Sequence, residues 1–148
     1  MKNEKKVIIE LLSKKPYIIF AYLFGSNVKG YSNEKSDWDI AVYFKESITQ
    51  KERWPQFELE AELSRAIGGL VQVIILNRPL PPVFGFEIIK HGILLLDRNP
   101  NLRMDFENRT LRDYHDWQYF LNRQMEAERN SFHKKMRWPV IGYLESSC

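Results

Sequence analysis

Two short motifs contain the side chains of this chain that are best suited to chemistry. Gly25-Ser26 is followed, after a gap of ten residues, by Asp37 and Asp39, which flank a single tryptophan. Glycine permits close backbone approach, and amide groups at a tight turn point toward an anion such as a phosphate. Paired carboxylates repel each other unless a cation lies between them, and Mg²⁺ favours such oxygen ligands together with substrate phosphates. The combination predicts transfer of a nucleotide from a metal-bound triphosphate.

These four residues form the predicted site. Gly25 and Ser26 are the predicted nucleotide-binding residues, with the Ser26 hydroxyl donating to a phosphate oxygen. Asp37 and Asp39 are the predicted catalytic residues and metal ligands, because residues two apart on a strand project from the same face. An isolated Asp-x-Asp is most often a turn or a solvated strand end, so the prediction depends on both motifs occurring in this order on adjoining strands.

Apolar runs around the motifs predict a small mixed α/β domain, of the α+β kind, in which helices flank one mixed β-sheet. The predicted strands are 17–24, 37–45, 70–76 and 93–96. The predicted helices are 4–13, 51–67, 83–90 and a long one that starts at Asn99-Pro100 and runs to about Arg129. Residues 1–98 then form the core, and residues 99–148 form a C-terminal helical extension of the same domain.

The C-terminal extension carries more aromatic side chains than one buried stripe requires. Phe106, Tyr114, Trp117, Tyr119 and Phe120 cover more than one face of the predicted helix. A helix that is apolar over a wide arc is either deeply buried or contacts another chain. We therefore expect the extension to contact a protein partner, in a hetero-oligomer.

Composition excludes several classes of protein. The chain has 148 residues, 44% hydrophobic and 28% charged, which is ordinary for one globular domain. It has no run of 18 apolar residues, so no membrane association is expected. A net charge of +3 is too mild to argue for direct nucleic-acid binding. The only cysteine is Cys148 and no secretory signal is visible, so we expect a cytoplasmic protein without an internal disulfide.

The residues around the two motifs also resemble a known family. Phe24-Gly25-Ser26 and the segment 36–40, Ser-Asp-Trp-Asp-Ile, are similar to the signature of the minimal nucleotidyltransferases, a branch of the DNA polymerase β-like superfamily. The resemblance covers roughly Tyr17 to Leu96 and, more loosely, the C-terminal helix. It implies a polymerase β-like nucleotidyltransferase fold that uses Mg²⁺ and a nucleoside triphosphate, with ATP as the substrate.

The resemblance also implies a partner. Many of these small proteins are antitoxins paired with an all-helical HEPN toxin. Such an antitoxin transfers AMP from ATP to a tyrosine hydroxyl of the toxin, and this AMPylation silences the RNase activity of the toxin. The expected partners are therefore a HEPN-type toxin and ATP.

One position departs from the superfamily pattern. Gln72 stands where a third carboxylate is often found, and it is the only polar residue in 70–76, so we expect its side chain to face the site. An amide offers a neutral oxygen but cannot accept a proton. Glu87 and Asp97 are other acids that could compensate. Two alternatives stay open: a catalytically weakened binding module that neutralises its toxin by occlusion, and a stand-alone nucleotidyltransferase for a small hydroxyl substrate.

Overall fold

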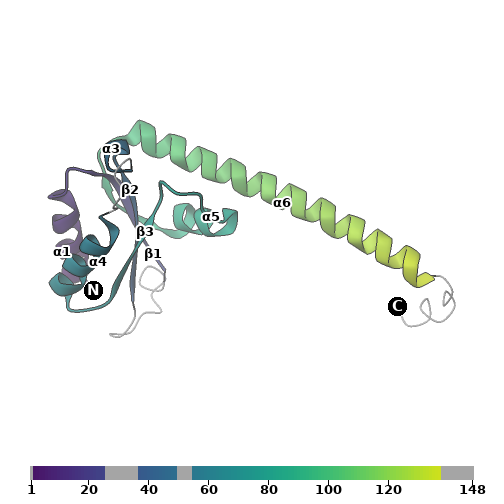
Figure 1. Cartoon of the computed structure of the whole chain (residues 1–148), viewed down its shortest axis with the longest axis horizontal. Coiled ribbons are helices and arrows are strands. Elements are labelled where there is room, and N and C mark those ends of the chain that lie inside the picture. The colour runs from purple at the N-terminus through teal and green to yellow at the C-terminus, as the bar shows by residue number, and fades with distance from the viewer. Residues whose placement is uncertain (1, 26–36, 50–54, 138–148) are drawn as a thin grey trace. The chain divides into compact units, whose positions relative to one another are not determined.

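The computed structural model describes residues 2–25, 37–49 and 55–137, and Figure 1 shows the arrangement of its elements. In chain order these are α1 (Lys2–Ser13), β1 (Ile18–Phe24), β2 (Trp38–Phe44), α3 (Glu46–Thr49), α4 (Gln56–Ile67), β3 (Val71–Ile75), α5 (Pro82–His91), β4 (Ile93–Asp97) and α6 (Pro100–Arg137). The chain divides into two compact units, residues 1–111 and 112–148, and the first contains the whole sheet. None of the described helices combines the length and apolar character needed to cross a membrane.

The four described strands form one mixed sheet in the order β3-β2-β1-β4. β1 pairs antiparallel with both β2 and β4, whereas β2 and β3 are parallel. A parallel pair needs a crossover connection, and α4 lies in the connection between these two strands. The predicted fold class, a mixed sheet with flanking helices and a C-terminal helix, is confirmed.

Each face of the sheet is covered by helices, and the two faces have separate cores. α1 and α4 pack on one face, where Ile8 and Leu63 share a core with alternate residues of the strands, and α5 lies on the other face (Figure 1). Along β2 the residues Trp38, Ile40 and Val42 belong to the core under α1 and α4. The residues between them therefore point to the face of α5, since strand side chains alternate.

The ends of two helices follow the sequence signals. α4 ends at Gly68, whose φ of 68° is left-handed and suits glycine. α6 begins at Pro100, and the Asn99 side chain accepts a hydrogen bond from the amide of Leu102 at 3.1 Å, as an N-cap does. α6 continues to Arg137, beyond the predicted end. The four-residue α3 is too short to show a periodicity, which is why no helix is predicted there.

Polar side chains of α4 cover the outer edge of β3. The Gln56 side chain donates to the backbone carbonyl of Val73 at 2.7 Å, and the Glu60 carboxylate accepts from the backbone amide of Val73 at 2.9 Å. Ser64 accepts from the amide of Val71 at 3.1 Å. Three backbone groups on this edge are therefore already bonded, which makes the edge a poorer template for another strand.

Candidate functional site

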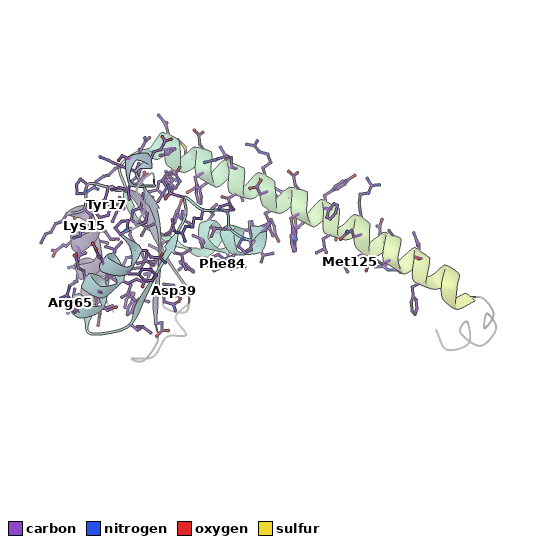
Figure 2. The ribbon with its side chains drawn as sticks, viewed as in Figure 1. Lys15, Tyr17, Asp39, Arg65, Phe84 and Met125 are labelled. Atoms are coloured by element: carbon purple, nitrogen blue, oxygen red, sulfur yellow. The ribbon has the colours of Figure 1, made fainter. Side chains whose placement is uncertain are left out.

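Asp39 lies at the centre of the candidate site, at one end of the sheet. It pairs with Phe24 on β1 and with Gln72 on β3, so it is flanked on both sides by the backbone of a neighbouring strand. Its side chain is half-buried and projects from the face that carries α5. Figure 2 shows Asp39 at the end of the sheet away from Tyr17, which precedes β1. Asp37, directly before β2, is exposed.

Gly25 approaches the Asp39 carboxylate closely. Its φ is +90°, a conformation that side-chain-bearing residues rarely adopt. A Cβ at this position would lie 2.5 Å from Asp39 Oδ2. The end of β1 and the start of β2 therefore meet in a space that only glycine leaves open. Ser26, the other predicted nucleotide-binding residue, lies outside the described residues.

The carboxylate of Asp39 is in an environment that disfavours its charge. Burial, and then the negative charge of Asp37, raise the pKa of the Asp39 carboxyl above its usual value. A cation near the two carboxylates would reverse the second effect and stabilise the ionised form. The space left by Gly25, the half-buried carboxylate and the second acid beside it fit a divalent cation that accompanies a phosphate. Asp37 and Asp39 are the described residues that would hold it.

The parallel register of β2 and β3 places Gln72 directly beside Asp39. Paired residues of neighbouring parallel strands point to the same face, and neighbouring strands lie roughly 5 Å apart. Gln72 is exposed, whereas Val71 and Val73 on either side of it are buried in the core under α4. The side chain of Gln72 is therefore accessible to a ligand on the same face of the sheet as Asp39.

An aromatic pair borders the same end of the sheet. Phe24, the partner of Asp39 across β1, meets Phe84 of α5 edge to face, with ring centroids 5.5 Å apart. Phe84 lies on α5 (Figure 2). Both rings pack against the core between the sheet and α5, so the pair fixes the end of β1 that leads into Gly25.

The structure places Asp97 away from the site. Asp97 pairs with Phe20, whereas Asp39 pairs with Phe24 four residues further along β1, which is roughly 13 Å of strand. Its carboxylate accepts a hydrogen bond from Arg103 Nε at 2.7 Å. Compensation for Gln72 by Asp97 is therefore not supported by its position. The other acid considered, Glu87, has a carboxylate oxygen 3.8 Å from His91 Nε2, one turn along α5.

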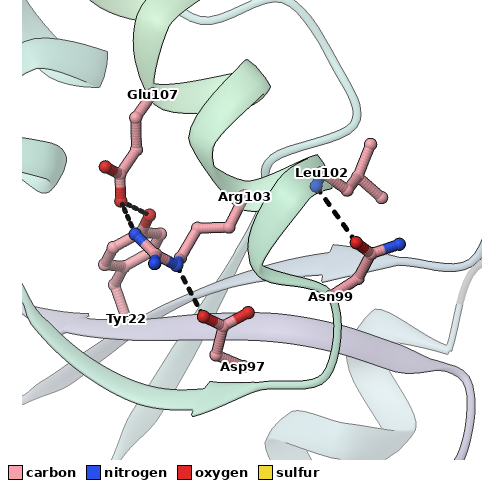
Figure 3. A network of polar contacts seen from close by, with 6 residues as sticks. All are labelled: Tyr22, Asp97, Asn99, Leu102, Arg103 and Glu107. Carbon is pink, nitrogen blue, oxygen red and sulfur yellow. Dashed lines mark hydrogen bonds and ion pairs between the residues drawn. The ribbon is translucent and has the colours of Figure 1, made fainter.

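Arg103 belongs to a polar network that fastens the first turns of α6 to the sheet (Figure 3). It also donates to Glu107 Oε1 at 2.9 Å, and Tyr22 of β1 donates to the same oxygen at 2.6 Å. Burial and the hydrogen bond to Glu107 raise the pKa of the Tyr22 phenol, so it stays protonated. The spacing of Arg103 and Glu107 is a visible sequence signal, but no local pattern links them to Tyr22.

The aromatic residues of the predicted extension have different environments. Phe106 is buried in the core between the sheet and α5. In the second unit, Tyr114 stacks on Trp117, whereas Tyr119 and Phe120 are exposed. Exposed aromatic side chains within residues 112–132 agree with the expectation that this segment contacts another protein, which stays a prediction.

The mixed sheet brings Asp39 of the Asp-x-Asp motif against a left-handed glycine that follows the preceding strand. Residues 6–101 match the family described as polymerase beta, nucleotidyltransferase, and the chain belongs to that family. A stretch of 90 residues is also 35% identical to the protein adenylyltransferase MntA of Shewanella oneidensis strain MR-1. This stretch covers 61% of the chain and 62% of the relative, a little less than two thirds of its length.

Solved structures share the fold over most of the chain. A toxin–antitoxin structure with AMP-PNP matches with a TM-score of 0.62 at 24% identity, over 89% of this chain and 97% of the other. A structure of the tri-AMPylated Shewanella oneidensis HEPN toxin in complex with its MNT antitoxin matches with a TM-score of 0.58 at 22% identity, over 91% and 97%. At these identities the likeness shows a common fold.

Proposed function

We propose that this chain is a Mg²⁺-dependent nucleotidyltransferase antitoxin that transfers AMP from ATP to a tyrosine hydroxyl of a cognate HEPN toxin. The observation that carries the proposal is the close approach of Gly25 to the Asp39 carboxylate, within a chain that belongs to the nucleotidyltransferase family. The identity to a protein adenylyltransferase and the fold shared with toxin–antitoxin structures support it. The proposed place of action is the cytoplasm.

The residues of this chain act by positioning. Asp37 and Asp39 would hold the cation, which supplies neutralisation of the triphosphate charge when it is bound. Gly25 lets the backbone approach the phosphates, and Ser26 is the proposed hydroxyl donor to one of their oxygens. The acceptor oxygen bonds to the α-phosphorus of ATP, the bond from that phosphorus to pyrophosphate breaks, and the proton of the acceptor leaves to water. Catalysis of this kind rests on alignment and electrostatics.

A second candidate function is favoured by Gln72. If the uncharged amide beside Asp39 reflects weakened catalysis, the chain would neutralise its partner by occlusion, through the exposed aromatic residues of α6. This candidate predicts that protection from the toxin does not depend on the carboxylates of the site.

The intact mass of the partner separates the two candidates. The cognate HEPN toxin is mixed with this chain, ATP and Mg²⁺, and the mass and RNase activity of the toxin are measured. The proposed function predicts a gain of one or more AMP units and loss of RNase activity, both abolished by Asp39→Asn. Glu10→Gln, which removes an exposed carboxylate from α1, is the matched control and should retain full transfer. A tight complex of unchanged mass, with protection retained in Asp39→Asn, would instead establish occlusion.

A further inference from the structure

The uncharged side chain of Gln72 limits the negative charge available to a ligand at the site. Its Cα is paired with that of Asp39 and its side chain is exposed on the same face of the sheet. It is therefore placed to contact whatever Asp39 binds. An amide oxygen can coordinate a cation, but it contributes no charge and cannot accept a proton at neutral pH.

Asp37 and Asp39 match the ligand set of one divalent cation, and Gln72 adds no charge toward a second. Mg²⁺ is usually bound through one or two carboxylates together with substrate phosphates, and Asp37 and Asp39 match that number. A second ion would lie about 3.5–4 Å from the first, where the repulsion between the ions has to be offset by further negative charge. Among the described residues, no group of three or more His, Cys, Asp or Glu side chains is close enough to hold a metal.

The same absence of charge bears on the acceptor. With an amide at position 72, the neighbouring strand of Asp39 offers no carboxylate to take a proton from the attacking hydroxyl. A phenol has a pKa of about 10, whereas the pKa of an alcohol is close to that of water, about 15.7. At neutral pH the ionised fraction of a phenol therefore exceeds that of an alcohol by roughly six orders of magnitude.

We infer that Gln72 makes this a one-ion site that selects acidic hydroxyls. The chain binds ATP with a single divalent cation, and it transfers AMP to phenolic oxygens but not to aliphatic ones. Gln72 is thus a specificity-determining residue, and a carboxylate in its place would admit a second ion and a less acidic acceptor. This inference rests on the proposed nucleotidyltransferase function.

The first test counts ions and does not depend on turnover. Mn²⁺ binding is titrated by electron paramagnetic resonance in the presence of saturating AMP-PNP, for the full chain and for two variants. We expect one Mn²⁺ for each nucleotide-bound wild-type chain, two for Gln72→Asp, and one for Gln72→Asn, which has the shape of aspartate without its charge. Two ions in the wild-type chain would overturn the inference, even if the variants failed to fold.

The second test changes the acceptor. The cognate toxin is supplied with its modified tyrosine intact or replaced by serine, and the rate of AMP incorporation is measured. We expect the wild-type chain and Gln72→Asn to modify the serine at least 1000-fold more slowly than the tyrosine, on the order set by their acidities. Gln72→Asp should raise transfer to the serine by roughly tenfold or more, because it adds one carboxylate that can accept the proton of the hydroxyl.

The outcomes separate the inference from the function on which it rests. Rapid transfer to the serine by the wild-type chain, or a folded Gln72→Asp variant that keeps one ion and rejects the serine, would overturn the role of Gln72 and leave the transferase intact. Absence of any nucleotide-dependent Mn²⁺ binding by the wild-type chain would overturn the proposed function itself, and with it this inference.

Discussion

Replacement of Gly25 by alanine tests whether the position of the Asp39 carboxylate matters for the reaction. The new Cβ would lie 2.5 Å from Asp39 Oδ2, whereas ordinary contact begins at 3.4 Å, so the carboxylate has to move by about 0.9 Å. A misplacement of about 1 Å at a reacting centre can reduce the rate by about 100-fold. We therefore expect Gly25→Ala to lower kcat/KM for AMP transfer by about 100-fold.

Gly68 provides the matched control. It is also left-handed, with φ of 68°, but a Cβ there would meet nothing within 4 Å. Both alanine variants carry a backbone strain of about 1–2 kcal/mol, measurable by chemical denaturation, because a Cβ is disfavoured in this conformation. Only Gly25→Ala displaces a site residue. If Gly25→Ala transferred AMP within about threefold of Gly68→Ala, the position that Gly25 gives the Asp39 carboxylate would not matter for the reaction.

Three further predictions concern stability. Burial and a neighbouring carboxylate raise the pKa of Asp39, so the ionised side chain destabilises the folded state at a pH above that pKa. This destabilisation disappears as the pH falls below the ordinary pKa of aspartate. Asp39→Asn should therefore raise the unfolding midpoint at pH 7.5 without Mg²⁺ and give no gain near pH 3. A lower midpoint for Asp39→Asn at pH 7.5 would contradict this. Arg103→Met should lower the free energy of unfolding in urea by about 2 kcal/mol, since it leaves the Asp97 carboxylate unpaired. An unchanged unfolding midpoint would show that water replaces the arginine as the partner of this carboxylate. Glu60→Ala should cost about 1–2 kcal/mol by removing the acceptor of the Val73 amide, and Glu60→Gln, which keeps an acceptor oxygen, should recover most of that loss.

The strands and the central acid of the site were predictable from local sequence. Each strand is a run of apolar or β-branched residues between clear breaks, and the glycine that ends β1 is separated from Asp39 by a short polar segment. The alternation of β3, with one polar residue among apolar ones, predicts the face on which Gln72 lies. Its pairing with Asp39 is a property of the parallel register, which depends on the crossover through α4 and has no local signal.

Contacts between distant segments were not predictable in the same way. The hydrogen bond from Tyr22 to Glu107 joins residues 85 positions apart, and no periodicity reports such a pair. The polar residues of α4 that cover β3 look like an ordinary solvated helix face until the strand is placed beside them. For Asp97 the residue type alone was misleading. A carboxylate would suit the site, but the antiparallel pairing of β4 with β1 places Asp97 beside Phe20, away from Asp39.

The hydrogen bonds from α4 to the edge of β3 require the spacing of residues along the helix to match the spacing along the strand. Glu60 and Ser64 are one helical turn apart, about 6 Å along the axis, and the amides they bind, on Val73 and Val71, are about 6.6 Å apart along the strand. The helix and the strand run in opposite directions, and the spacings of the two pairs of residues agree over this length. A substitution on the outer face of α4 leaves the match intact, whereas insertion of one residue between these positions would rotate one contact by about 100° and break it. Related chains should therefore vary in composition along α4 but keep its length.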